Sequence, residues 1–552
     1  MRLHAACRVG ALSVAAGVAL SACSGPPSRA AAPVQIWSDG LFDDWRGVPA
    51  AVIDSAGDAG EGSAVDLGAV HLHDDPQFLH VLAEMGDTVT ILAMPGTLEV
   101  VMEIDGDPGT GNSYGGVEGA DLVVVLSRLW GNGGSWGAGV GVRRLGGDDP
   151  ESVESASSVG LLVAPTHSSD RFEVRLDRRA LADWSGIETP AAGDSIAVRL
   201  RFLALDSVAD ETETFHYRLA TSPGADPPLL SAKSVDRTPG TLRVVAWNVA
   251  DGGFRDRRPA FERVVRGLNP DVVLLDEVHA DVTMSELERF GDSLGEESGP
   301  EWRWWLAQGG GRQRTVVGAR GLQLLGDPSL ARIAHEPGAL ERWLERAGNE
   351  PEYPGMPPPS MLARAEAEGG LSATGAWVAW GGLEILFAPV DLQSAGYDGS
   401  PRDRLRELQA RTLNRALAAA LADRPGAGLV VAGDLNLVGS ARPLEELRAS
   451  LEAGGGNLQV ARVERLRDRS LATWRSMDPR APFSPGRLDY VLYRGAMLSL
   501  ERAFIFDAED LSAEALTLLG IHASDSRASD HLPLVADFSL RRPASEAPLT
   551  AN

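Results

Sequence analysis

The hydrophobic pattern changes part-way along the chain, and this change constrains the fold more than any other feature. Before about Leu230, apolar and polar residues alternate in short runs, such as Phe172 to Leu176 and Ser195 to Leu203. A period of two is typical of strands with one buried face, and the Gly, Asp and Pro residues between the runs indicate turns. Several such runs predict a β-sandwich over residues 34–230.

Beyond this region, continuous apolar strand candidates alternate with helical patterns. The strand candidates are Leu242 to Asn248, Asp271 to Glu277 and Gly428 to Ala432, and the helix candidates are Arg258 to Leu268 and Arg402 to Leu421. Strands that alternate with helices predict an α/β domain, here over residues 241–541. We expect a linker at residues 231–240, an insertion with a short helix at 340–370, and a tail at 542–552. A length of 552 residues agrees with a multidomain protein.

The N-terminus has the pattern of an exported protein. Two arginines precede the apolar run Val9 to Leu20, which is too short to span a bilayer but fits the core of a signal peptide. The following Leu-Ser-Ala-Cys23 resembles the cleavage motif of bacterial lipoproteins, in which the cysteine thiol is acylated. We therefore predict a signal peptide at residues 1–22, a lipid-bearing Cys23 and a tether over residues 23–33. The alternative is an ordinary secretory peptide that is cut nearby, with Cys23 left as a free thiol.

Charge and cysteine content exclude some classes of function. The net charge of −26 disfavours a protein that binds polyanions through a broad basic surface, although a local basic groove stays possible. The two cysteines, Cys7 and Cys23, both lie near the N-terminus, so the body of the chain has no intrachain disulfide and no thiolate metal site. The cell envelope, with the protein at the periplasmic or the outer surface, is the expected location.

Polar residues collect where the apolar strands of the predicted α/β domain end. Carboxylates, amides and one histidine in these places suit a hard divalent cation beside a group that transfers protons. Each residue alone is weak evidence for such a site, since Asp and Asn are common in turns. Their occurrence together in this order is informative. They are Asn248, Glu277, Asp434, Asn436, Asp489, Asp530 and His531.

These motifs resemble those of the endonuclease/exonuclease/phosphatase superfamily, which contains the DNase I-like nucleases. The resemblance covers residues 240–541 and rests on five motifs in the family's order. They are Trp247-Asn248-Val249, Asp271 to Glu277, Gly433-Asp434-Leu435-Asn436, Arg487-Leu488-Asp489-Tyr490 and Ser529-Asp530-His531 followed by Pro533. The resemblance implies a DNase I-like sandwich of four layers, with two β-sheets flanked by helices and the site at one end.

The resemblance also implies roles for these residues. Asn248, Glu277 and Asp530 would hold Mg²⁺ or Mn²⁺. Asp434 would orient or deprotonate the attacking water, and Asn436 would donate to a phosphate oxygen. His531, oriented by Asp489, would stabilise the phosphoryl charge or transfer a proton. The chemistry of phosphoryl transfer agrees with these roles, because a cation and fixed hydrogen-bond donors offset the negative charge that grows on the phosphoryl oxygens.

One position departs from the family pattern. The superfamily usually has a histidine in a strand motif before the helix that precedes Gly-Asp-x-Asn, and Asp391 stands at that position here. A carboxylate repels a phosphate unless it is protonated or bound to a metal. Asp391 therefore either works with a cation or caps local backbone in a domain that has lost activity. His279 would lie on the same face as Glu277 if that strand continues, and would then partly compensate; we expect instead a loop histidine without a catalytic role.

The predicted sandwich contains the stretches Ser38 to Trp45, Asp74 to His80, Ile104 to Gly111 and Gly119 to Asp121. These stretches resemble the carbohydrate-binding, DOMON-like modules of secreted proteins. Asp105, Asp107 and Asp121 would supply carboxylates to Ca²⁺, or the Asp-Gly pairs form only hairpin turns. Trp130 and Trp136 flank a glycine-rich loop and would stack on a sugar or pack in the core.

Together these features predict an exported, lipid-anchored, metal-dependent phosphoesterase that hydrolyses a phosphodiester or phosphomonoester with an activated water. Its partners would be a nucleic acid, lipid or sugar phosphate, the membrane, and a carbohydrate for the sandwich; nothing indicates an oligomer. The alternative is a non-catalytic surface binding protein that keeps the phosphoesterase fold.

Overall fold

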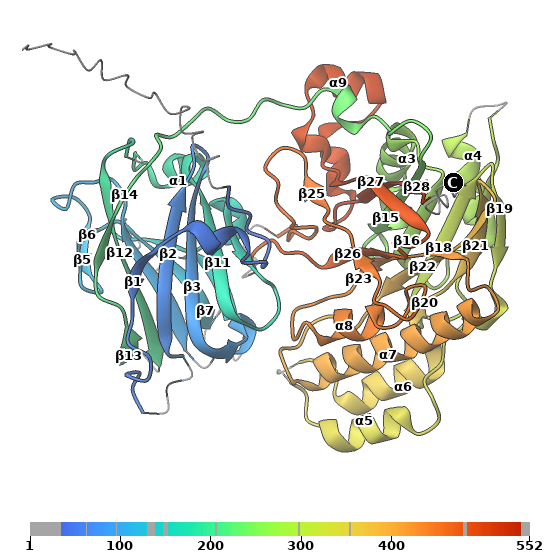
Figure 1. Cartoon of the computed structure of the whole chain (residues 1–552), viewed down its shortest axis with the longest axis horizontal. Coiled ribbons are helices and arrows are strands. Elements are labelled where there is room, and N and C mark those ends of the chain that lie inside the picture. Colours follow the sequence, from blue (N-terminus) through green and yellow to red (C-terminus); the bar gives the residue numbers. More distant parts are fainter. Residues whose placement is uncertain are drawn as a thin grey trace, which may run out of the picture. The chain divides into compact units, whose positions relative to one another are not determined.

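The computed structural model describes residues 35–541, except residues 62, 64, 95, 130–137, 147–152, 189, 205–206, 296–298, 353–354 and 479–482. The predicted signal peptide, Cys23, the tether and the tail at 542–552 therefore lie outside the described residues. The described residues from Ile36 onward cluster as one unit. Within it, one set of sheets is built from the first part of the sequence and a second set from the part that follows residue 241, as the colours of Figure 1 show.

The first part of the chain forms the predicted β-sandwich. Its first sheet has the order β1 (Ala50–Ile53), β2 (Leu67–Asp74), β3 (Phe78–Val89), β11 (Ser169–Asp177), β10 (Leu161–Ala164). Its second sheet has the order β13 (Ser207–Glu211), β12 (Ser195–Ala204), β4 (Thr97–Glu103), β7 (Leu122–Leu129), β8 (Ala138–Arg144), β9 (Val153–Ser155), with β14 (Phe215–Arg218) also paired to β12. One buried apolar cluster draws side chains from both sheets, so the alternating runs face a common core.

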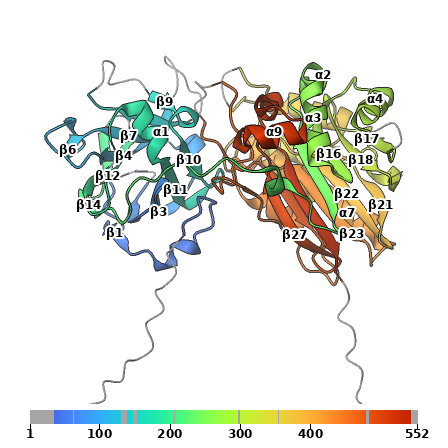
Figure 2. The same cartoon turned by 90° about the horizontal axis from the view of Figure 1, so that it is seen from above.

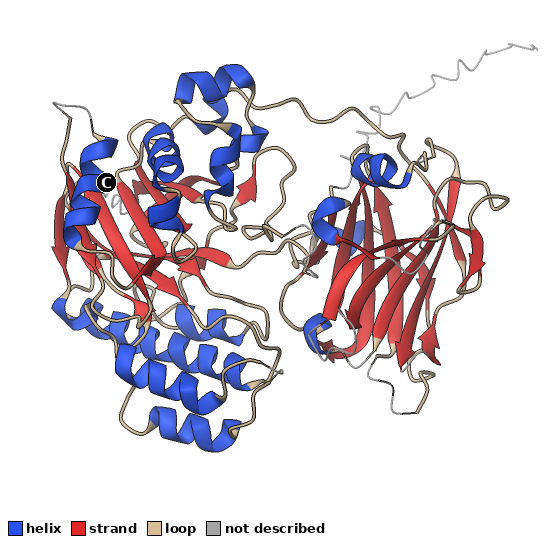
Figure 3. Ribbon diagram, turned by 180° about the vertical axis from the view of Figure 1, so that it is seen from behind, coloured by secondary structure: helices blue, strands red, loops and turns tan. Residues whose placement is uncertain are grey.

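The second part forms an α/β domain with two further sheets (Figure 3). The β16 sheet has the order β17 (Trp302–Leu306), β18 (Gln313–Arg320), β16 (Val272–His279), β15 (Leu242–Asn248), β28 (Leu534–Leu540), β27 (Leu498–Ile505), β25 (Glu464–Arg465). The β23 sheet has the order β19 (Gln323–Gly326), β21 (Ala376–Trp380), β22 (Leu383–Asp391), β23 (Gly428–Asp434), β26 (Asp489–Tyr493), β24 (Gln459–Val460), and β20 (Ser372–Ala373) also pairs with β22.

Three apolar layers hold this α/β domain together. Between the sheets, Leu274 of β16 and Val430 of β23 belong to one buried cluster. On the outer face of the β16 sheet, Phe261 of α3 (Arg258–Leu268) and Phe290 of α4 (Met284–Leu294) join a second cluster. On the outer face of the β23 sheet, Leu413 of α7 (Pro401–Ala422) joins a third. Helix, sheet, sheet and helix are therefore stacked as the predicted four-layer sandwich, and Figure 2 shows the same elements from above.

The largest predicted helix has clear start signals. Ser400 lies at the N-cap of α7, and its hydroxyl accepts a hydrogen bond from the backbone of Asp403, while Pro401 occupies the first helical position. The predicted insertion contains two helices rather than one, α5 (Ala339–Ala347) and α6 (Pro359–Gly369). Within the described residues, no helix is long and apolar enough to cross a membrane.

The predicted linker is not a bare spacer. It contains a short 3₁₀ helix, η4 (Ala232–Val235), and Val235 is buried in the same apolar cluster as α3. Arg243 at the start of β15 donates to the backbone oxygen of Val235 at 2.8 Å and pairs with Asp537 of β28 through two short bonds. The end of the linker is thus fastened to the α/β domain.

Candidate active site

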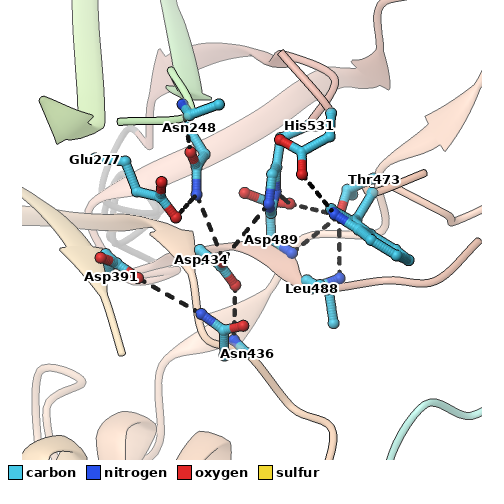
Figure 4. Close-up of polar contacts among 12 residues, drawn as sticks. Asn248, Glu277, Asp391, Asp434, Asn436, Thr473, Leu488, Asp489 and His531 are labelled. Atoms are coloured by element: carbon cyan, nitrogen blue, oxygen red, sulfur yellow. Dashed lines mark hydrogen bonds and ion pairs between the residues drawn. The ribbon is translucent and has the colours of Figure 1, made fainter. Parts of the chain in front are cut away.

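The polar residues named from the sequence meet at one end of the α/β domain, where the inner strands of both sheets end (Figure 4). Asn248 is the last residue of β15 and pairs with Asp276 of the parallel β16. In the other sheet, Asp434 at the end of β23 is flanked by Asp391 of β22 and Asp489 of β26. Continuous apolar strands position these side chains, because each strand is buried until its last residues.

His531 is held by a buried chain of hydrogen bonds. Its Nδ1–H donates to Oδ2 of Asp489 at 2.8 Å, and Thr473 Oγ1 donates to the same oxygen at 2.6 Å. The Thr473 hydroxyl in turn accepts the backbone N–H groups of Leu488 and Asp489, each at 3.0 Å. These contacts direct the Nε2 atom of His531 towards Asp434, whose Oδ2 lies 3.7 Å away.

Asp434 and Asn436 sit on a turn that requires glycine beside it. Gly433 has φ +140°, and a Cβ atom there would approach the backbone oxygen of Val390 to 2.1 Å. The turn that follows lets the backbone of Asn436 donate to Asp434 Oδ1 at 2.7 Å. The Asn436 side-chain nitrogen donates to the backbone oxygen of Leu392 at 2.9 Å and lies 3.5 Å from Asp391 Oδ1.

Glu277 is turned into the site by an irregularity of its strand. Its φ is +53°, and the pairing register between β16 and β18 shifts between Leu275 and Val278. The two Glu277 oxygens accept from Asn248 Nδ2 at 3.1 Å and from Gln313 Nε2 at 2.9 Å. The site thus presents a carboxylate oriented by two amides.

The carboxylates that lie closest together differ from the predicted metal ligands. One oxygen each from Glu277, Asp391 and Asp434 lies within 4.8 Å of the others, as three ligands of one cation would. Asn248 presents its amide nitrogen to Glu277, while its oxygen accepts from the backbone of Ala250. Burial and the negative charge of Asp530 raise the pKa of Glu277. The Oδ2 atom of Asp530 accepts the indole N–H of Trp474 at 3.0 Å. The predicted set of Asn248, Glu277 and Asp530 therefore stays a prediction.

Burial and mutual repulsion shift the acid–base properties of this site. Burial, together with the negative charges around them, raises the pKa values of Asp391 and Asp434 well above the ordinary range of a carboxyl group. Burial alone would lower the pKa of His531, but the charge and hydrogen bond of Asp489 raise it well above its usual value. Such a cluster suits a divalent cation, because a cation offsets the mutual repulsion of these carboxyl groups.

Three site residues escaped the sequence analysis. Gln313 and Thr473 are ordinary polar residues whose roles depend on pairings distant in sequence. Asp276, beside Glu277, lay inside a recognised motif but was not singled out, although an acidic residue at the end of an apolar strand was the available signal. His279 is part of β16, not of a loop, and its partner is Asp281 rather than any residue of the site.

The acidic residues of the sandwich are arranged differently from the predicted Ca²⁺ set. Oxygens of Glu103, Asp105 and Asp121 lie within 4.8 Å of one another. Asp107 instead accepts the backbone N–H of Gly109, as in a turn. Trp130 and Trp136 lie outside the described residues. The predicted carbohydrate and Ca²⁺ sites stay predictions.

The fold and the site together define a class of protein: a four-layer α/β sandwich with acids, amides and an Asp–His pair at the ends of its inner strands. The model of the Endonuclease/Exonuclease/phosphatase family matches residues 245–531, just over half of the chain. The chain therefore belongs to this family, whose members are metal-dependent phosphoesterases and nucleases.

The chain is also similar, at low sequence identity, to several solved structures. The catalytic domain of human Nocturnin, with a bound sulfate anion, is 17% identical over 55% of this chain and 97% of its own, with a TM-score of 0.32. Truncated TDP2 from Caenorhabditis elegans is 15% identical over 55% and 99%, with a TM-score of 0.35. The 3′ phosphatase NExo from Neisseria, bound to a product DNA hairpin, is 16% identical over 54% and 99%, with a TM-score of 0.33. A comparison with curated proteins found no match.

Proposed function

We propose that the α/β domain hydrolyses a phosphodiester or phosphomonoester with the help of Mg²⁺ or Mn²⁺. The observation that carries this proposal is the Asp489–His531 pair, which lies against the cluster of Glu277, Asp391 and Asp434. A fixed hydrogen-bond donor beside a cluster of acids supplies both halves of the chemistry, because one side binds a cation and the other moves a proton.

The residues divide the work according to their contacts. Glu277 would hold the cation, with Asp530 contributing nearby; when bound, the cation draws charge from the phosphoryl oxygens. Asp434 would take a proton from the attacking water, because its Oδ1 is fixed by the backbone of Asn436 while its Oδ2 faces the site. The water oxygen bonds to phosphorus, and the bond from phosphorus to the leaving oxygen breaks. His531 would donate to a phosphoryl oxygen, because Asp489 favours its charged form.

The experiment is hydrolysis of bis-p-nitrophenyl phosphate by the purified chain with Mg²⁺ or Mn²⁺ and with a chelator. We expect activity that the chelator abolishes, and losses on the order of 10²–10³ in rate for Glu277→Gln and His531→Ala. The matched controls are Glu288→Gln and His216→Ala, which change exposed residues outside the site. Wild-type rates in both site variants would place the chemistry elsewhere.

The alternative is a non-catalytic binding protein, and Asp391 is the observation that favours it. Its carboxylate stands where the family pattern has a histidine. The Oδ1 atom of this carboxylate lies 3.5 Å from the side-chain nitrogen of Asn436. If the chain binds the cation but releases no product from nucleic acid, lipid and sugar phosphates, this alternative is preferred. Such a panel also identifies the substrate class, which the fold does not define.

We propose further that the chain is exported and anchored through an acylated Cys23. The support is the sequence pattern of residues 1–23, a short apolar run followed by a lipoprotein-like motif. Fractionation of cells that express the wild type or Cys23→Ser tests this idea. We expect the wild type in the membrane fraction and the variant in the soluble one; a soluble wild type contradicts the anchor.

A further inference from the structure

Asp276 is a buried acid without a partner. Its side chain is fully buried, and neither carboxyl oxygen has a hydrogen-bond partner among the described residues. Its neighbour in sequence, Glu277, by contrast, accepts from two amides. A buried carboxyl group in this situation is neutralised either by a proton or by a nearby cation, since an isolated buried charge is too costly.

The position of Asp276 in its strand shows where this side chain points. Leu274, two residues earlier, belongs to the apolar core between the two sheets. Side chains two residues apart in a strand face the same way, so Asp276 points into the gap between the sheets. That gap is where β22 and β23 end, and the negative charges of Asp391 and Asp434 act on Asp276 there.

Asp276 is thus buried more deeply than Glu277 and Asp391, two of the three clustered carboxylates. Glu277 and Asp391 are half-buried, so solvent reaches them, whereas Asp434 is 1% exposed. Among the described residues, an ion pair places only His531 against this cluster, at 3.7 Å from Asp434. The charges of Arg406 and Arg312 also act on Asp434 and Glu277, but His531 already pairs with Asp489, so a divalent cation would offset the remaining negative charge of the four acids.

The spacing of the three oxygens suits a divalent cation. Opposite ligands are roughly 4 Å apart across Mg²⁺ and roughly 5 Å apart across Ca²⁺, from their usual bond lengths. The oxygens of Glu277, Asp391 and Asp434 fall within 4.8 Å of one another, with no rearrangement of the backbone. Asp530 is not part of this group.

We propose that Glu277, Asp391 and Asp434 bind a second divalent cation, next to the one expected between Glu277 and Asp530, and that the buried carboxylate of Asp276 strengthens this second site. The inference rests on the proposed function for the first cation. It deepens that function, because it assigns a cation to Asp391, the residue that differs from the family pattern. Glu277 would be shared by both cations. Asp391 and one oxygen of Asp434 would serve the second cation, and the other oxygen of Asp434 would accept the proton of the attacking water.

The test counts cations bound to the full chain, without substrate. Mn²⁺ titration followed by electron paramagnetic resonance gives the number bound and the affinities. We expect two Mn²⁺ in the wild type and one in Asp391→Asn, and also one in Asp530→Asn, which keeps the Asp391 site and loses the other. Asp276→Asn should weaken the second site about tenfold or more, because it removes a buried negative charge. Asp292→Asn, an exposed residue of α4, is the control with two Mn²⁺.

The outcomes separate this inference from the proposed function. One Mn²⁺ in both the wild type and Asp391→Asn overturns the second site and leaves the proposed function standing. No Mn²⁺ in the wild type overturns both. Unchanged affinities in Asp276→Asn overturn the part assigned to Asp276 and show that it is a buried neutral acid. Circular dichroism of each variant confirms that an altered count does not come from unfolding.

Discussion

The substitution Asp489→Asn isolates the charge that acts on His531. The Thr473 hydroxyl accepts two backbone N–H groups, so its own hydrogen must point to Oδ2 of Asp489. An asparagine in this place would turn its oxygen, not its nitrogen, towards Thr473. The same oxygen then still accepts from Nδ1 of His531, so the orientation of the imidazole is kept and only the negative charge is lost.

The size of the effect follows from the type of hydrogen bond. A bond to a charged group is worth about 1.5–3 kcal/mol and a neutral one about 0.5–1.5 kcal/mol. The difference, about 1–2 kcal/mol, corresponds to a rate loss of roughly 5–30-fold. Asp489→Ala removes the acceptor as well and lets the ring rotate, so its loss should be larger, on the order of 10² or more.

The assay is the turnover number for bis-p-nitrophenyl phosphate at saturating Mg²⁺, measured for the wild type, Asp489→Asn and Asp489→Ala. Thr473→Val provides a second check, because it frees Oδ2 and the orientation of an asparagine at position 489 is then no longer fixed. We expect Asp489→Asn to lose more activity when it is combined with Thr473→Val. If Asp489→Asn is as inactive as Asp489→Ala, the argument about orientation is wrong. If it is fully active, the charge has no part in turnover.

Three further predictions concern stability. Gly433→Ala should destabilise the α/β domain by about 3 kcal/mol or more in urea unfolding, because a Cβ atom would meet the backbone oxygen of Val390 at 2.1 Å and φ is +140°. Arg243→Met should cost about 3–5 kcal/mol in the same assay, because it leaves the buried carboxylate of Asp537 without its cation. Burial raises the pKa of Glu173 to about 8, so its protonated form stabilises the sandwich below the unfolded pKa and this contribution is lost as pH rises through about 8. Hydrogen exchange in β11 should therefore accelerate between pH 5 and pH 8, after correction for the intrinsic rate.

Each of these predictions has a matched control. Gly426→Ala should have little effect, since nothing lies within 4 Å of the added Cβ. Arg364→Met breaks an exposed pair with Glu368 and should cost less than about 1 kcal/mol. Glu173→Gln removes the titrating group, so the excess acceleration with pH should disappear whatever its absolute stability. Equal effects in variant and control would contradict the corresponding argument.

The sequence predicted buried strands and amphipathic helices of the α/β domain. The strand at Leu242–Asn248 and the helix at Arg258–Leu268 were predicted with the bounds they have, because continuous apolar runs and helical spacing are local signals. The order of strands in the sheets was not predicted, since pairing is decided by contacts between distant segments. The site was predicted as a set of residues at strand ends for the same reason. The sequence shows which residues these are, but it does not show the distances between them.

What the sequence could not show is how each side chain is held. Asn248 was predicted to hold a metal, yet only the structure shows that its amide nitrogen faces Glu277 and that its oxygen faces Ala250. Asp276 is the sequence neighbour of Glu277. Only the three-dimensional structure shows that its carboxyl group is buried without a hydrogen-bond partner among the described residues. Asp391 was recognised because it departs from a family pattern, but its closeness to Asp434 required the paired strands β22 and β23.

Several residues at the proposed site have a left-handed backbone conformation. Among the described residues, Glu277 and Asn436 have positive φ values of 53° and 49°, and Ala250 and Asp251 follow Asn248 with values of 53° and 50°. A left-handed residue other than glycine costs about 1–2 kcal/mol, so such turns persist only where the surroundings enforce them. Here the enforcing element is the buried part of each strand, which fixes the chain up to its last residue. The strain therefore has a use: it turns side chains from neighbouring strands towards one point, which regular strand geometry would direct to opposite faces of the sheet.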